Sequence, residues 1–314
     1  MNGLELSEKY YIECGKPMLE AEFPELLPYL ALGLVGSGSE RFGFDDEVSR
    51  DHDFEPGFCI FLPDEETVGR RQAFLLERAY GKLPKEFEGF RRGYLSPVGG
   101  SRNGVIRTAE FYEKAVGAGD GELAMEAWLR IPDYALAEAT NGMIFADPYG
   151  EFTRIREKLL HMPRDARLKR LAGNLLLMAQ AGQYNFPRCL RHGEAEAAQL
   201  AVTNFVEAAM KTTFLLKEKY MPYYKWSFRA LRELMPGDEL PDQLSFLLFG
   251  DNTDPWMAEQ KMKTIEDIAG GVIGDLQEKG LTKAVCGDLE KHAYAVNDCI
   301  EDGNVRNLHI LTAV

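Results

Sequence analysis

The spacing of apolar and polar residues changes along the chain, and the change falls near residue 150. Before it, short apolar runs alternate with segments of helical spacing. The apolar runs at residues 29–35, 58–62 and 144–146 are too short for helices and end at glycine, proline or aspartate, which predicts buried strands. A further strand is predicted at residues 102–108. Helices are predicted between the strands, at residues 7–20, 65–83, 109–114 and 123–139.

Helical spacing alone describes the rest of the chain. Apolar stripes with a period of about 3.6 residues predict helices at residues 167–180, 193–220, 227–235, 244–249, 256–276 and 281–301. Short loops join them, which is typical of a helical bundle. A strand-rich part followed by an all-helical part predicts an α+β fold, with one domain at residues 1–150 and a helical bundle domain at residues 151–314.

A glycine–serine turn (residues 36–39) follows the first apolar run directly. Its backbone N–H groups and two hydroxyls are little hindered, which suits an anion such as a triphosphate. Beyond the turn, Asp51 and Asp53 are separated by one residue. In an extended strand, residues i and i+2 point to the same face, so the two carboxylates would lie side by side while His52 faces away. Two neighbouring carboxylates repel each other unless a cation lies between them. Because carboxylate oxygens are hard ligands, the cation that they favour is Mg2+.

The combination of this turn with the two aspartates resembles the nucleotidyltransferase superfamily, which has the polymerase-β-like fold. The signature of that superfamily is an apolar residue, Gly-Ser, a spacer and Asp-x-Asp on the next strand. The matching residues are Val35-Gly36-Ser37 and Asp51-His52-Asp53. The wider stretch at residues 36–58 looks like a bacterial branch, of the DUF4037 type, near the aminoglycoside and minimal nucleotidyltransferases. A glycine–serine turn followed by an acidic surface loop is the alternative interpretation of the same residues.

The resemblance implies a mixed sheet with helices in the first domain, Mg2+ held by Asp51 and Asp53, and ATP as the donor substrate. The residues that would bind the nucleotide in this part are Gly36, Ser37, Ser39 and Arg41. Active members usually carry a third carboxylate, expected here near residues 105–107, where the sequence has none. Glu110 is the nearest acid and the candidate for that catalytic role. A glutamate at this position is equally explained as a partner of the positive end of a helix.

Two breaks in the helical part carry aromatic and basic residues, at 183–188 and 221–226. They resemble positions at which partner domains face the nucleotide in this superfamily. Arg188 and Lys225 are therefore candidates for nucleotide binding, since nucleotidyl transfer depends on cations around the transferring group. Tyr184, Tyr223 and Tyr224 could stack on a base or a substrate ring. Aromatic core packing beside cations that reach solvent is the alternative.

The composition of the chain favours some cellular compartments and binding partners over others. The 314 residues suit two domains, contain no apolar stretch long enough to span a bilayer, and open without the features of a signal peptide. The five cysteines form no CxxC pair, which fits reduced thiols in a cytoplasmic protein. The net charge of −14 repels nucleic acid and fits a cationic acceptor, although solubility alone explains it equally well.

The function implied by the resemblance is transfer of a nucleoside monophosphate, with AMP from ATP as the default, to a hydroxyl group of a small molecule or a protein. The alternative is a non-catalytic nucleotide-binding or antitoxin-like interaction protein that has lost the third acid. A carboxylate within reach of the metal would favour the enzyme, and its absence would favour the binder. A nucleic-acid-modifying transferase is a third hypothesis, against which the acidity of the chain argues.

Overall fold

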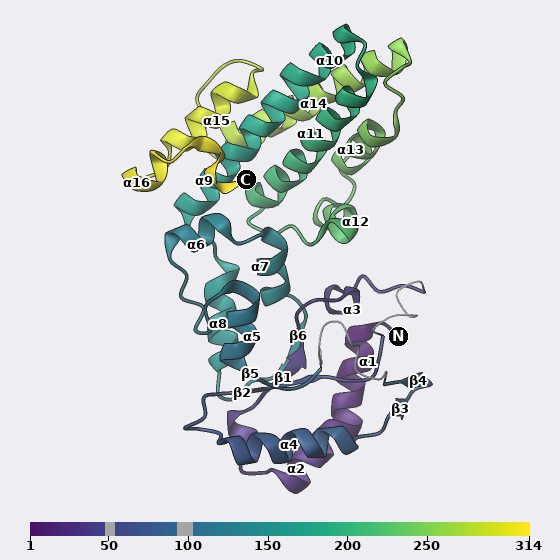
Figure 1. The fold of residues 1–314 in the computed structure, drawn as a ribbon, viewed down its shortest axis with the longest axis vertical. Coiled ribbons are helices and arrows are strands. Elements are labelled where there is room, and N and C mark those ends of the chain that lie inside the picture. The colour runs from purple at the N-terminus through teal and green to yellow at the C-terminus, as the bar shows by residue number, and fades with distance from the viewer. Residues whose placement is uncertain (48–53, 93–102) are drawn as a thin grey trace. The chain divides into compact units, whose positions relative to one another are not determined.

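The computed structural model describes residues 1–47, 54–92 and 103–314 of the chain (Figure 1). Helices dominate, and the described strands form a four-stranded mixed sheet and a two-stranded hairpin. This confirms the α+β fold predicted from the sequence. Contacts group the chain into two compact units, one of residues 1–123 and 134–161 and the other of residues 124–133 and 162–314. The predicted domain boundary at residue 150 stays a prediction.

The four-stranded sheet is the centre of the first unit. β1 is antiparallel to both β2 and β6, whereas β2 and β5 are parallel. The end of β1 therefore lies beside the starts of the other three strands. β3 (Glu86–Phe87) and β4 (Phe90–Arg91) form the separate hairpin. The strands of the sheet, in the order β5-β2-β1-β6, are β5 (Gly104–Arg107), β2 (Cys59–Leu62), β1 (Ala31–Leu34) and β6 (Met143–Ala146).

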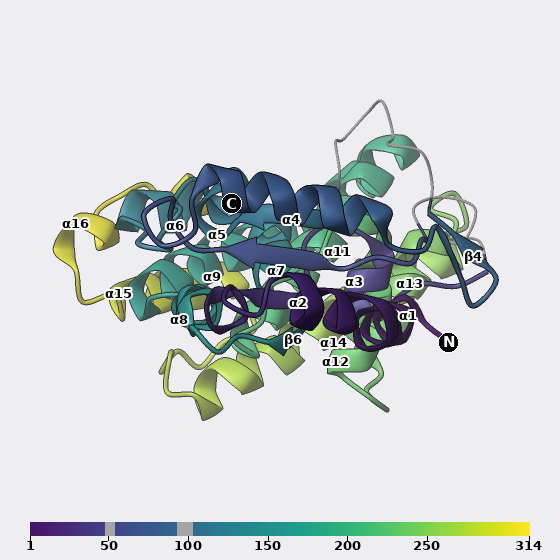
Figure 2. The ribbon, with the colours of Figure 1, turned by 90° about the horizontal axis from the view of Figure 1, so that it is seen from below.

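Helices cover both faces of this sheet (Figures 1 and 2). Side chains alternate between the two faces along each strand, so each strand contributes residues to both layers of contact. On one face, Leu32, Ile60 and Leu62 belong to a buried core shared with the helices beneath them. Those elements are α1 (Gly3–Tyr10), the π-helical turn Tyr11–Gly15, α2 (Lys16–Glu22) and α4 (Arg70–Lys82).

On the opposite face of the sheet, aromatic rings make the contact. The Phe61 ring lies 5.3 Å from that of Phe111 in α5 (Thr108–Val116) and 4.4 Å from that of Phe152 in α8 (Glu151–Leu160), centroid to centroid. The first unit thus has helix, sheet and helix layers. Its short connecting elements are the 3-10 turn Leu27–Tyr29 before β1, α3 (Ser39–Phe42) after the glycine–serine turn, and α7 (Asp133–Thr140) before β6.

The second unit is a helical bundle around α9 (Arg164–Met178), whose side chains are mostly buried. α11 (Ala195–Leu216) and α15 (Leu289–Asp298) pack along it (Figure 1). The remaining elements are α6 (Met125–Arg130), the π-helical turn Ala179–Asn185, α10 (Phe186–His192), α12 (Tyr224–Leu234), α13 (Leu240–Phe249), α14 (Pro255–Glu278), α16 (Gly303–Arg306) and the 3-10 turn Ile310–Ala313.

Three predicted helices are shorter in the structure, and the one predicted at residues 65–83 begins only at Arg70. The helix predicted at residues 123–139 is divided into α6 and α7, because Pro132 lies between them and has no N–H to donate within a continuous helix. The helix predicted at residues 281–301 begins only at Leu289. The residues before it form a loop that the buried His292 ring holds, with 3.0 Å to Thr282 Oγ1 and 2.9 Å to the carbonyl oxygen of Cys286.

Candidate functional site

The glycine–serine turn lies at an edge of the sheet where four chain segments meet. It follows the end of β1, and the antiparallel register pairs Gly33 with Cys59, so the residues that lead into β2 run beside it. The starts of β5 and β6 lie at the same edge, because Cys59 pairs with Gly104 and Leu34 with Met143. The sequence prediction that the turn follows a buried strand is confirmed, since every residue of β1 is buried.

The backbone of the turn has a conformation that favours glycine. Gly36 and Gly38 have φ angles of +109° and +133°, and Gly36 is buried whereas the Ser37 side chain is exposed. The N–H groups of Ser37, Gly38 and Ser39 have no hydrogen-bond partner among the described residues. Consecutive free N–H groups of this kind make a concave donor site for an anion.

Asn141 clamps the buried end of the turn. Its Oδ1 accepts a hydrogen bond from the Gly36 N–H at 2.8 Å, and its Nδ2 donates to the Gly36 carbonyl at 2.7 Å. The next residue, Gly142, has a φ of +70°, and a Cβ there would lie 2.0 Å from the Leu34 carbonyl oxygen. The Asn-Gly pair before β6 therefore fits directly against the end of β1. The Gly36 N–H is engaged inside the protein, which leaves the three following N–H groups for a ligand.

Arg41 is almost fully buried, with 2% of its surface exposed, and it ties the turn to its neighbours. Its Nη1 donates to the Ser37 carbonyl at 2.7 Å, and its Nη2 donates to Asn103 Oδ1 at 2.9 Å. It also forms an ion pair with Glu40. The guanidinium group thus balances the Glu40 carboxylate, which lies against Gly38 and would otherwise repel an anion bound at the turn.

The carboxylate of Glu55 and the thiol of Cys59 also lie at this edge of the sheet. Asn103 Nδ2 is 3.5 Å from Glu55 Oε1, so the residue before β5 links the segment before β2 to Arg41. Burial raises the pKa of the Cys59 thiol, and the positive charge of Arg41 opposes that rise.

The predicted metal ligands, Asp51 and Asp53, lie outside the described residues, as does His52. In the part of the chain that the structure describes, no group of three His, Cys, Asp or Glu side chains is arranged to hold a metal ion. The described chain resumes at Phe54, and residues 54–58 lead into β2 beside the turn, because β2 is antiparallel to β1.

The expected third carboxylate is not on β5, whose residues are Gly104-Val105-Ile106-Arg107. Arg107 donates from Nη1 to the carbonyl oxygens of Pro63 and Asp64, at 2.7 and 3.1 Å, and so braces the far end of the sheet. Glu110 is exposed in the first turn of α5. The neighbouring Phe111 ring would lie 3.4 Å from a Cβ placed at Gly36, so α5 packs beside the turn.

The basic and aromatic candidates of the second unit do not form one cluster. Arg188 lies in α10 and Lys225 in the first turn of α12, at opposite ends of α11 (Figure 1), and a helix of that length spans about 33 Å. Both side chains are exposed. Arg188 lies over the Tyr184 ring, 5.6 Å from its centroid, and the Tyr223 and Tyr224 ring centroids are 4.5 Å apart. The exposed fractions of Tyr184, Tyr223 and Tyr224 are 60%, 43% and 71%, so these rings are not core residues.

Comparison with known families bears on part of the chain. Residues 128–227 match the family model described as a domain of unknown function (DUF4037). The matched segment contains Asn141, Arg188 and Lys225 but neither the glycine–serine turn nor the two aspartates. A search of curated proteins found no match to the chain. Among the described helices, none combines the length and the apolar composition needed to cross a membrane.

Sequence reasoning did not identify Asn141, Asn103 or Glu55 as parts of this site. A common signal was present, since Asn103-Gly104 and Asn141-Gly142 both stand directly before a strand. An Asn-Gly pair marks a turn from sequence alone, but the partner of each amide lies far away in the chain. Asn141 bonds to a residue 105 positions earlier, and Asn103 to one 62 positions earlier.

Proposed function

We propose that the chain is a Mg2+-dependent nucleotidyltransferase that moves AMP from ATP to a hydroxyl group of a small molecule or a protein. The observation that carries the proposal is the row of free N–H groups at Ser37, Gly38 and Ser39, held at the edge of the sheet where residues 54–58, which follow Asp53 in the sequence, lead into β2. A phosphate chain needs such donors, and a metal-bound nucleotide needs carboxylates near them.

In this proposal each group at the turn has one role. The N–H groups and hydroxyls of Ser37 and Ser39 hold the β- and γ-phosphates, while Gly36 and Arg41 keep the turn in shape. Asp51 and Asp53 are the ligands of Mg2+, which when bound neutralises charge on the triphosphate. The acceptor hydroxyl forms a bond to the α-phosphorus, the bond to the pyrophosphate group breaks, and the hydroxyl proton passes to a base. Glu110 is the candidate for that base.

Calorimetry with ATP tests the site. Wild-type protein should bind ATP with Mg2+ and bind it much more weakly without Mg2+. The Asp51→Asn/Asp53→Asn variant should lose at least tenfold in affinity, because the negative ligands of the metal are gone. The matched control is Glu65→Gln/Glu66→Gln, which removes two exposed carboxylates from the turn after β2, at the other end of the sheet. Equal binding by the aspartate variant and wild type would remove the site assignment.

A non-catalytic nucleotide-binding or antitoxin-like protein is the second candidate, and the absence of a carboxylate from β5 favours it. Pyrophosphate release separates the two functions, measured with ATP, Mg2+ and a panel of aminoglycosides and other hydroxyl compounds. The enzyme releases pyrophosphate in proportion to acceptor modified, and Glu110→Gln slows this release while leaving ATP affinity unchanged. A protein that binds ATP through Asp51 and Asp53 but releases no pyrophosphate with any acceptor, protein acceptors included, is the binder.

A further inference from the structure

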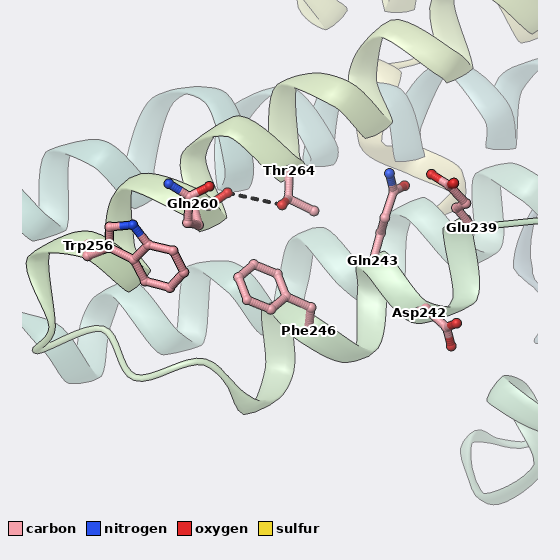
Figure 3. Close-up of a pocket in the computed structure, with 7 residues that line it drawn as sticks. All are labelled: Glu239, Asp242, Gln243, Phe246, Trp256, Gln260 and Thr264. Atoms are coloured by element: carbon pink, nitrogen blue, oxygen red, sulfur yellow. Dashed lines mark hydrogen bonds between the residues drawn. The ribbon is translucent and has the colours of Figure 1, made fainter.

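A groove between α13 and α14 in the second unit has no role in the function proposed above (Figure 3). Its volume is about 460 Å3, and it is lined by Glu239, Asp242, Gln243, Phe246, Trp256, Gln260 and Thr264. Four of these residues follow helical spacing along α13, and the other three recur every fourth residue along α14. Two helix faces that would ordinarily be apolar and packed together therefore remain partly open, with polar and aromatic side chains between them.

The chemistry of the lining changes along the groove (Figure 3). The Trp256 and Phe246 rings lie at one end with the Gln260 amide beside them, the Gln243 amide lies further along, and the carboxylates of Glu239 and Asp242 lie at the other end. Glu239 and Phe246 are seven residues apart, which corresponds to about 10 Å along the helix axis. No cation lines the groove.

Thr264 Oγ1 donates to the Gln260 carbonyl oxygen at 3.0 Å, whereas four other polar side chains of the groove have no partner among the described residues. In the described residues, neither Glu239 nor Asp242 takes part in an ion pair, and the side-chain amides of Gln243 and Gln260 make no hydrogen bond. The Trp256 side chain is 62% exposed, although a buried indole is the usual outcome for this residue. The exposed indole and the two half-buried amides leave an aromatic face and hydrogen-bonding groups available to a ligand.

The aromatic end of the groove is held rigidly from below. Lys261, one residue after Gln260, is fully buried and donates to Asn252 Oδ1 at 2.7 Å and to Gln199 Oε1 at 3.1 Å. Asp254 caps α14 by accepting from the Trp256 N–H at 3.0 Å. These contacts fix the start of α14 against α11, so Trp256 is presented on an ordered helix end. Because this part of the protein is already ordered, a ligand that binds there loses little binding free energy to ordering of the protein.

We propose that this groove binds a linear organic polycation, of the polyamine class. The ammonium group at one end pairs with Glu239, Asp242 adds negative charge at the same end, and the methylene spacer lies along the groove. A second ammonium group lies against the Trp256 and Phe246 rings, where the negative faces of the aromatic rings attract it. The Gln243 and Gln260 carbonyl oxygens accept from the N–H groups between. The proposal stands independently of nucleotide binding in the first unit.

Calorimetric titration of the full chain with spermidine tests this. We expect saturable 1:1 binding that weakens as salt is raised. Both Glu239→Gln/Asp242→Asn and Trp256→Ala should weaken it at least tenfold. The matched control is Glu278→Gln/Asp298→Asn, which removes two exposed carboxylates of the same unit outside the groove and should leave the affinity within twofold of wild type. 1,8-Octanediol, which has a spacer but no charge, should not bind.

Several outcomes would overturn the proposal. Equal weakening by both double variants would show general attraction of a cation to an acidic protein. Binding of the diol as tightly as spermidine would show an apolar groove without charge selection, and absence of spermidine binding would remove the site. Light scattering covers one further possibility: a wild-type dimer that Trp256→Ala dissociates and that spermidine leaves intact would make the groove a contact between two copies of the chain.

Discussion

Replacing Asn141 with alanine should loosen the glycine–serine turn selectively. The side chain makes two hydrogen bonds to Gly36, at 2.8 and 2.7 Å, in a partly buried position. Each bond of this kind contributes about 1 kcal/mol net, so the variant should lose about 2 kcal/mol of local stability. That loss raises the opening equilibrium of the turn by a factor of about 30. The main part of the first unit should stay folded, because its aromatic and aliphatic core does not include Asn141.

Hydrogen–deuterium exchange read by mass spectrometry is the suitable assay, because all three tryptophans lie in the second unit and their fluorescence does not report on the turn. The Gly36 amide, read as the difference between overlapping peptides within residues 31–36, should exchange about 30-fold faster in Asn141→Ala than in wild type. Peptides from α9 and α11 should exchange at the wild-type rate. The control is Asn204→Ala, which removes an exposed amide from α11 and should leave residues 31–36 unchanged.

Unchanged exchange at residues 31–36 in Asn141→Ala would refute the reasoning, because it would mean that the two hydrogen bonds do not hold the turn. Faster exchange throughout the first unit would refute it in another way, by showing that Asn141 supports the whole unit and not the turn. ATP affinity gives a second measurement. If the free N–H groups of the turn bind phosphate, the loosened variant should bind ATP more weakly with Asp51 and Asp53 intact.

Three further predictions concern packing and buried charge. Gly142→Ala should destabilise the protein by at least 2 kcal/mol more than Gly150→Ala in thermal unfolding, since both glycines have similar positive φ angles but only a Cβ at Gly142 meets a carbonyl oxygen, at 2.0 Å. Burial lowers the pKa of Lys261, so the unfolded chain holds this proton to higher pH, and the contribution of Lys261 to stability should rise with pH up to about 10.5, where the unfolded lysine titrates. Lys261→Met should flatten that rise in urea unfolding followed by tryptophan fluorescence. Asp133→Ala should cost about 3 kcal/mol by leaving Arg170 buried without its ion pair, and adding Arg170→Met should recover part of the loss.

The fold was predictable where local pattern decides it. The apolar runs that end at glycine, proline or aspartate became β1, β2 and β6, and the region after residue 160 is helical as the spacing indicated. The division of the helix at Pro132 could also have been predicted, because proline breaks a helix interior. The prediction of one continuous helix followed the apolar spacing instead. The loop before Leu289 could not be predicted from the spacing of apolar residues, because contacts to the His292 ring hold it in place.

Only those features of the candidate site that depend on residues close together in the sequence were predictable. Glycines at 36 and 38 indicated a turn with unusual backbone angles, and the structure has φ values of +109° and +133° there. Arg41 was predicted from the sequence to bind the nucleotide, and in the structure it is buried and bonded to Ser37, Glu40 and Asn103. Its nucleotide-binding role stays a prediction. Long-range contacts decide such cases, and spacing along the chain carries no information about them.

The family match and the glycine–serine turn lie on different stretches of the chain, yet the structure joins them. The matched residues 128–227 include α7, β6 and α8 of the first unit as well as much of the second. Asn141 and Gly142 are in the matched segment, and both press on the last residues of β1 and the start of the turn. The matched segment therefore supplies one wall of the candidate site. A chain with this segment but without β1 and its turn would leave the Asn141 amide unpaired and the inner edge of β6 exposed, so the two parts are expected to occur together as one folding unit.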